Sequence, residues 1–367
     1  MKTAVCGSGP GAMAIAAHLA EAGRSTTIVD RPEFASNVAA ISARGGVEAR
    51  SGWWGARVLP VEATHDGIGT VADADLVVIS VPASAHETWV SEVAPVLRAG
   101  ATLLFMGEGS GSLVARRVLL DADRPDLLVG ETNCLPMIAR AAGPGVVVGE
   151  KKTGGVLIAA IPSPRTAELL GLVSDVWPLL ETAGSVFETA LVNYDAIDIV
   201  PVAIANAATI EGRRGGMLLW GEGATPSVVR LVEALDAELF ALRGALGGTD
   251  PRRYRDFLIA QGLAPDVGDL YAVMRAGGIT RSVRPSGGPE DLVARLDLEV
   301  PWSLVLASSI GEAVGLATPV IDGLIDVAGT MLARDVRAEG RTLTTLGLGG
   351  LDADRLRAYA AGDPFSS

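Results

Sequence analysis

The chain has 367 residues, of which 49% are hydrophobic and 4% aromatic, and its formal net charge at pH 7 is −13. This length suits two packed domains, and so acidic a surface argues against binding to nucleic acids or anionic membranes. With two cysteines and three histidines, none at metal-ligand spacing, the composition also argues against a disulfide framework and a zinc site.

The N-terminal stretch lacks the basic region, apolar core and cleavage site of a secretory signal. No apolar run approaches the roughly 20 residues of a transmembrane helix. We therefore expect a soluble, cytoplasmic protein. Cys6 lies in an apolar run and is interpreted as a small buried hydrophobic residue.

The first elements form a βαβ unit. Residues 3–6 predict a short buried strand, residues 11–22 have the apolar spacing of a helix, and Gly23 is a typical helix stop. A second strand, 26–29, ends at Asp30. His18 lies inside the predicted helix and is interpreted as structural.

Strands and helices continue to alternate to about residue 187, and this predicts a doubly wound parallel sheet of Rossmann type. We predict a helix at 85–97 and further strands at 75–81, 101–106, 127–130, 146–149, 156–161 and 185–187, with 146–149 and 156–161 forming a pair. Beyond this point the periodicity is helical. The sequence thus predicts a dinucleotide-binding domain at 1–187 and an all-helical domain for substrate and dimerisation at 188–367.

The loop between the first strand and helix fits G-x-G-x-x-A. In this pattern the first glycine permits the tight turn, the second lets a pyrophosphate approach the backbone, and the alanine lets helix and strand pack closely. The phosphates would lie at the helix N-terminus, which favours anions. The alternative is a plain glycine turn. We predict cofactor contacts at Gly7, Ser8, Gly9, Pro10, Gly11 and Ala12.

Cofactor choice depends on two adjacent residues with opposite effects. Asp30 can accept the hydrogen bonds of the NAD ribose and repels the NADP phosphate. Arg31 could instead bind that phosphate, or it could be a solvated charge. We expect NAD or NADP, with NAD slightly favoured.

A third cofactor contact is expected where the strand at 75–81 ends. Ligands of open α/β sheets bind at the carboxyl ends of the strands. This places Val81, Pro82 and Ala83 near the cofactor, and His86 close behind them. A histidine in such a place is more often simply a partly exposed side chain without a role.

Four later stretches carry a family resemblance: GETNCLP from Gly130, residues 193–206, EGATPSV from Glu222, and TPVID from Thr318 to the LGL at 346–348. Together with the glycine loop, they resemble the octopine/nopaline dehydrogenase (opine dehydrogenase) family over nearly the whole chain. The resemblance implies a Rossmann-type domain followed by a helical domain, with the active site between them, and dimers occur in the family. It also implies reductive condensation of an amino acid with a 2-oxo acid by NAD(P)H.

The chain departs from the family where catalysis is expected. The family's presumed acid–base histidine, followed by proline, corresponds here to Ile199 and Val200, and no histidine follows His86. In a second motif Glu299 stands for the family's aspartate. Ala294 stands for an arginine expected to hold a substrate carboxylate, although Arg295 is adjacent.

Reducing a preformed imine needs less acid–base chemistry than opine synthesis, because a protonated iminium already carries an electrophilic carbon. We therefore hypothesise an imine reductase of an amino-acid-like, preformed or cyclic substrate, in which Glu299 or Asp198 stabilises the cation. Either acid could instead be a capping or ion-pair residue. Opine synthesis itself stays open, as do carbonyl reduction and a non-catalytic dinucleotide sensor.

Substrate contacts are expected from polar residues near the presumed site. The end of a sheet strand and the first helical segment of the second domain supply them. They could also merely satisfy buried backbone groups. The candidates are Thr132, Asn133, Asn193, Tyr194 and Asn206, while Trp220 and Trp302 are interpreted as packing residues.

Overall fold

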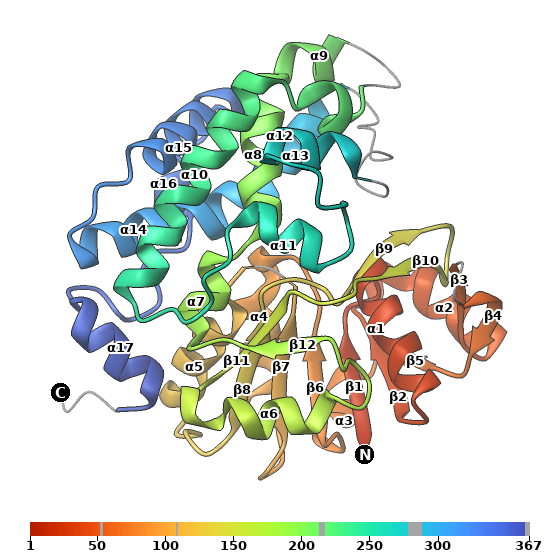
Figure 1. Cartoon of the computed structure of the whole chain (residues 1–367). Helices are drawn as coiled ribbons and strands as arrows, with labels where there is room; N and C mark the ends of the chain where they lie inside the picture. Colours follow the sequence, from red (N-terminus) through yellow and green to blue (C-terminus); the bar gives the residue numbers. More distant parts are fainter. Residues whose placement is uncertain (52–53, 108, 213–216, 278–287, 364–367) are drawn as a thin grey trace. The chain divides into compact units, whose positions relative to one another are not determined.

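The computed structural model describes residues 1–51, 54–107, 109–212, 217–277 and 288–363. The chain forms two compact units, one comprising Met1–Lys152 with Val156–Thr182 and the other Thr153–Gly155 with Ala183–Ser367. Figure 1 colours the first from red to yellow-green and the second from green to blue. Each unit is described by itself below.

The first unit is built on an eight-stranded sheet of order β12-β11-β8-β7-β6-β1-β2-β5. Its central strands are buried on both faces and apolar, as parallel strands covered by helices require. All neighbours pair in parallel except β11, which runs antiparallel to β8. The strands are β1 (Lys2–Cys6), β2 (Ser25–Val29), β5 (Glu62–Thr64), β6 (Leu76–Ile79), β7 (Thr102–Met106), β8 (Leu128–Thr132), β11 (Val156–Ile161) and β12 (Leu180–Thr182). The Rossmann-type fold expected from the sequence is confirmed.

Helices and short 3-10 turns connect these strands. They are α1 (Pro10–Glu21), η1 (Pro32–Phe34), α2 (Ala35–Arg44), α3 (Gly67–Ala72), η2 (Ala83–Ala85), α4 (His86–Val93), α5 (Gly111–Asp121), η3 (Ser163–Arg165) and α6 (Thr166–Val173). His18 of α1 is buried and accepts a 3.1 Å hydrogen bond on Nδ1 from Trp177 Nε1. Burial, with a smaller contribution from Lys151, lowers the pKa of His18 to about 3. His18 is therefore neutral and structural, as predicted.

A second, four-stranded sheet of order β4-β3-β10-β9 was not predicted. It comprises β3 (Val47–Ser51), β4 (Gly55–Leu59), β9 (Met137–Ala141) and β10 (Val146–Lys151). The predicted pairing of 146–149 with 156–161 is wrong, because β10 pairs with β3 and β9 whereas β11 joins the main sheet. Both segments have strand character, but only the tertiary fold selects their partners.

The described part of the second unit is helical. Proline at the first turn begins α10, α13 and α15, where its missing N–H costs nothing. The elements are α7 (Val186–Leu191), α8 (Tyr194–Ala205), α9 (Ala207–Gly212), the π-helix η4 (Leu219–Gly223), α10 (Pro226–Ala245), α11 (Tyr254–Ala260), α12 (Leu270–Ala276), α13 (Pro289–Glu299), the π-helix η6 (Val300–Leu304), α14 (Val305–Val314), α15 (Pro319–Leu332), α16 (Val336–Glu339) and α17 (Ala353–Ala361).

The strand predicted at 185–187 is wrong, since these residues open helix α7 and the last strand is β12. A short apolar run does not distinguish a strand from the first turn of a buried helix. Among the helices that the structure describes, none combines the length and apolar character needed to cross a bilayer.

Candidate cofactor and active sites

The glycine loop joins β1 to α1, and its two outer glycines are closely packed. Gly7 has φ +104°, and a Cβ there would lie 2.6 Å from the backbone oxygen of Ser80. A Cβ on Gly11 would lie 3.0 Å from Leu135 Cδ1. Ala12 is fully buried in the contact between α1 and the sheet. A side chain larger than hydrogen at position 7 would therefore displace the loop.

Gly9 differs from both, because a Cβ at this position would meet no atom within 4 Å. It is the N-cap of α1 and provides no side-chain cap, and Pro10 follows at the first helical position. The first amides of α1 are thus left for another acceptor. An open backbone at a helix N-terminus is what a pyrophosphate group requires.

Asp30 follows β2 and is buried at 6% exposure. Its Oδ2 accepts a hydrogen bond from Ser8 Oγ, and its Oδ1 accepts one from the Arg31 amide at 2.8 Å. A cavity of about 350 Å³ opens beside it. The loop serine and the strand-end aspartate are therefore joined next to a space large enough for part of a nucleotide.

The residues predicted to contact the cofactor after β6 include one that packs against the glycine loop. Val81 Cγ1 would be 2.9 Å from a Cβ on Gly7, so this side chain supports the turn. Pro82 caps η2, which contains Ala83. His86 is the first residue of α4; it is 3% exposed and packs edge-on against Phe105 with ring centroids 5.1 Å apart.

Thr132 and Asn133 lie at the carboxyl end of β8. Asn133 Oδ1 accepts a 2.8 Å hydrogen bond from the Leu157 amide, which ties β8 to β11. Thr132 is 1% exposed, and its Oγ1 has no hydrogen-bond partner among the described residues. Burying a hydroxyl without a hydrogen-bond partner costs free energy. This hydroxyl lies at the carboxyl end of a strand, where ligands of such folds bind.

In the second unit, Asp198 of α8 lies in a buried polar cluster. Its Oδ2 accepts a 2.6 Å hydrogen bond from Trp220 Nε1 of η4 and another from the Tyr254 hydroxyl of α11. Its Oδ1 is buried and has no hydrogen-bond partner in the described part of the chain. Burial, reinforced by nearby Asp195, raises the pKa of Asp198 well above its usual value, although interactions with Tyr254, Trp220 and the Ile199 backbone oppose the shift. Folding therefore shifts the balance of Asp198 toward its protonated form.

A second cluster surrounds Glu299, which ends α13 where η6 begins. Asn193 caps α8 through Oδ1, which accepts from the Ala196 amide at 3.1 Å. Its Nδ2 lies 2.8 Å from Glu299 Oε2 and 2.6 Å from Ser303 Oγ. Two π-helical turns thus accompany the two predicted acids, and such turns are frequent at functional sites.

The other predicted residues of the second unit flank these clusters. The Tyr194 hydroxyl donates to the Gly155 carbonyl at 3.2 Å, and its ring lies 6.1 Å from that of Tyr254. Asn206 donates from Nδ2 to the carbonyls of Val202 at 2.8 Å and Gly223 at 3.1 Å. Asn206 therefore joins the C-terminus of α8 to η4.

Sequence reasoning missed the partners of the predicted acids. Trp220 was interpreted as packing, yet its indole N–H also holds Asp198, and Tyr254 and Ser303 were not singled out. No local pattern marks them, since Tyr254 lies 56 residues from Asp198. Arg295, which adjoins the position of the family's carboxylate-binding arginine, forms an i,i+4 ion pair with Asp291 at 3.3 Å.

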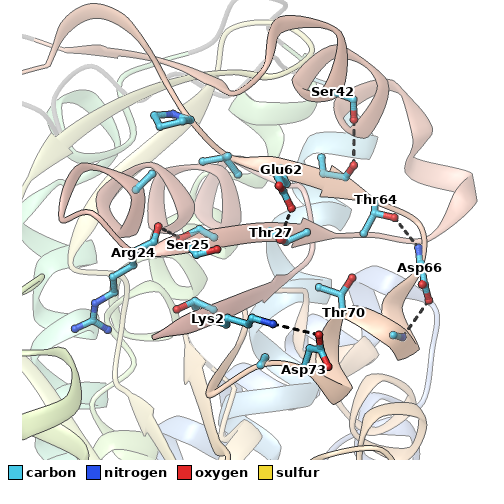
Figure 2. Close-up of a pocket in the computed structure, with 18 of the residues that line it drawn as sticks. Lys2, Arg24, Ser25, Thr27, Ser42, Glu62, Thr64, Asp66, Thr70 and Asp73 are labelled. Carbon is cyan, nitrogen blue, oxygen red and sulfur yellow. Dashed lines mark hydrogen bonds and ion pairs between the residues drawn. The ribbon is translucent and has the colours of Figure 1, made fainter.

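A larger cavity of about 1170 Å³ runs along β1, β2 and β5 of the first unit, and Figure 2 shows its lining. Polar side chains in its lining form hydrogen bonds with one another. Lys2 Nζ donates to Asp73 at 3.2 Å, and Thr27 Oγ1 donates to Glu62 at 3.3 Å. Residues 7–12 line neither cavity, but Asp30 lines only the smaller of the two. The smaller cavity is therefore the candidate site for the cofactor's ribose.

Two family profiles match the chain, one in its N-terminal part and one in its C-terminal part. Residues 182–332 match the family profile of the NAD/NADP octopine/nopaline dehydrogenase alpha-helical domain. Residues 3–137 match that of ketopantoate reductase PanE/ApbA.

Similar proteins span the whole length. An opine dehydrogenase of Arthrobacter sp. (strain 1C) is 30% identical over 357 residues, covering 97% of both chains. An octopine dehydrogenase solved with NADH and agmatine superposes with a TM-score of 0.80 at 17% identity, over 100% of this chain and 99% of the other. A yersinopine dehydrogenase with bound NADP⁺ gives a TM-score of 0.67 at 14% identity, over 99% and 98%.

Proposed function

This chain belongs to the opine dehydrogenase family and is an NAD(P)-dependent oxidoreductase acting on C–N bonds; from this premise we propose that its substrate is a preformed imine of an amino-acid-like compound. The observation that carries the proposal is the replacement of the family's presumed acid–base histidine by Ile199, beside the retained acid Asp198. No histidine lies beyond His86, so no shift of alignment restores one.

The first unit suits a nicotinamide dinucleotide. Gly9 leaves space over the first turn of α1, and Asp30 adjoins a cavity of about 350 Å³. When bound, the reduced cofactor supplies a hydride to the imine carbon. Asp30 favours NAD, because an acid there accepts the ribose hydroxyls and repels a 2′-phosphate. We propose NADH as the preferred cofactor.

The two acids of the second unit suit different tasks. Asp198 is held in an environment that favours its protonated form, so it is the candidate proton donor to an imine nitrogen. Glu299 is held in place by the hydrogen bond that its Oε2 accepts from Asn193, so it is the candidate stabiliser of a cationic imine. Thr132, with its unpartnered hydroxyl, is the candidate substrate contact in the first unit.

The test is NADH and NADPH oxidation followed at 340 nm with two substrate panels. One contains preformed cyclic imines, and the other contains 2-oxo acids mixed with amino acids. We expect turnover with the imines and at least tenfold less with the mixtures. Turnover confined to the mixtures would refute the proposal, because another group would then have to catalyse addition and loss of water.

Opine synthesis is the second candidate function. The 30% identity to an opine dehydrogenase over 97% of the chain favours it. In that case the protonated Asp198 would have to replace the missing histidine as acid and base. The Asp198→Asn variant distinguishes the two candidates when it is assayed with defined substrates. It would abolish condensation and slow reduction of a neutral imine, but it would leave reduction of an iminium that is already protonated in solution.

A further inference from the structure

The cavity beside Asp30 contains a second charged pair that the cofactor motif does not include. Arg31 Nη2 lies 2.9 Å from Glu92 Oε1, with the two side chains 30% and 53% exposed. The Arg31 guanidinium also lies over the Trp89 ring, 5.3 Å from its centroid. Trp89 and Glu92 are three residues apart on α4, so they share one helix face.

Arg31, the cation adjacent to Asp30, is therefore already engaged by Glu92 and Trp89. Arg31 is the residue best placed to bind a 2′-phosphate, because it follows Asp30 directly and its planar fork suits phosphate. Here its charge is already paired with Glu92 and its face already covers Trp89. Its Nε is buried without a hydrogen-bond partner among the described residues, so the side chain retains unused donor capacity.

The remaining charges of the cavity are unfavourable to a phosphate. Its titratable lining residues are Asp30, Arg31, Glu33, His65 and Glu92. Three carboxylates therefore oppose one guanidinium and one imidazole. His65 Nδ1 lies 2.8 Å from the Asp30 carbonyl oxygen, which occupies one of its ring nitrogens. A phosphate carries up to two negative charges near neutral pH.

We infer that Glu92 is a specificity-determining residue: by holding Arg31 against Trp89, it withholds from NADPH the one guanidinium that would bind the 2′-phosphate. The inference rests on the proposed cofactor site. Discrimination against NADPH then depends on two residues, Asp30 after β2 and Glu92 on α4. Glu92 lies 61 positions beyond Arg31 in the sequence.

The test measures equilibrium dissociation constants of NADH and NADPH by calorimetry, so no substrate is needed. In Glu92→Gln we expect NADPH to bind roughly three- to fivefold more tightly and NADH to change less than twofold, as for one partly exposed charge pair. Glu87→Gln is the matched control, since Glu87 lies on the same helix, pairs with Arg117 at 2.7 Å and does not line the cavity. We expect this control to leave both constants unchanged.

The double variant Glu92→Gln/Arg31→Gln separates release of Arg31 from a simple loss of charge. We expect it to lose the gain in NADPH affinity. A gain that persists in the double variant, or a NADPH-to-NADH ratio in Glu92→Gln within twofold of the original, would overturn the inference while leaving the cofactor site intact. Failure of the unsubstituted protein to bind either dinucleotide would overturn both the inference and the proposed function.

Discussion

Gly9→Ala separates the binding role of the glycine loop from its folding role. At φ −66° and ψ 174°, position 9 has a backbone conformation open to any residue, and an added Cβ would meet no atom within 4 Å. Loss of a glycine N-cap and the reduced entropy of the unfolded chain act in opposite directions, so we expect the free energy of unfolding to change by no more than about 0.5 kcal/mol.

Dinucleotide binding should respond very differently. A methyl group in the space expected for the pyrophosphate costs about 1–3 kcal/mol, as overpacking does, which is roughly a 5- to 150-fold loss of affinity. The assays are urea unfolding without cofactor and calorimetric titration with NADH. Unchanged NADH affinity in Gly9→Ala would refute the assignment of the pyrophosphate to this position.

Gly7→Ala is the matched comparison within the same loop. Here φ is +104° and the new Cβ would lie 2.6 Å from the Ser80 backbone oxygen, which is not free to move aside. Left-handed strain and overpacking together predict a loss of about 2–4 kcal/mol in the free energy of unfolding. A Gly7→Ala protein as stable as the original would contradict the described packing of the loop.

Three further variants test the acids and the buried histidine. Glu299→Gln keeps the acceptor for Asn193 but removes the charge, so kcat should fall by about 10²-fold or more with unchanged thermal stability; a kcat within twofold would exclude a catalytic role. The pKa of Asp198 is raised on folding, so its stabilising contribution is complete below the unfolded value of 3.8 and is lost as pH rises through the folded value. In urea unfolding, Asp198→Asn should therefore gain stability relative to the original protein as pH rises above 3.8, and parallel pH profiles would contradict this. Folding lowers the pKa of His18 from 6.5 to about 3. The free energy of unfolding should therefore fall by up to about 1.4 kcal/mol per pH unit as pH drops through this window. His18→Gln should flatten that slope, and an unchanged slope would show that other groups cause it.

The first βαβ unit could be predicted because its signals are local. The turn at Gly7 and the close packing at Ala12 each depend on a few neighbouring residues, and their spacing is written in the sequence. Asp30 was likewise identified from its place at the end of a strand. The sequence also indicated the change from alternating strands and helices to helices alone.

Other features could be decided only by the tertiary structure. Residues 146–149 have strand character in either sheet, and only packing placed them beside β3 and β9. The strand predicted at 185–187 became helix α7 because a short apolar run fits either element.

The sequence by itself determined the Rossmann-type unit, the G-x-G-x-x-A loop between its first strand and helix, and the absence of the family's histidine. Only the tertiary structure decided that Asp198 is buried against Trp220 and Tyr254, and that Glu92 holds Arg31. The physical reason is distance along the chain. Backbone conformation depends on adjacent residues, whereas the protonation of a carboxyl or the availability of a guanidinium depends on partners that folding brings from far away.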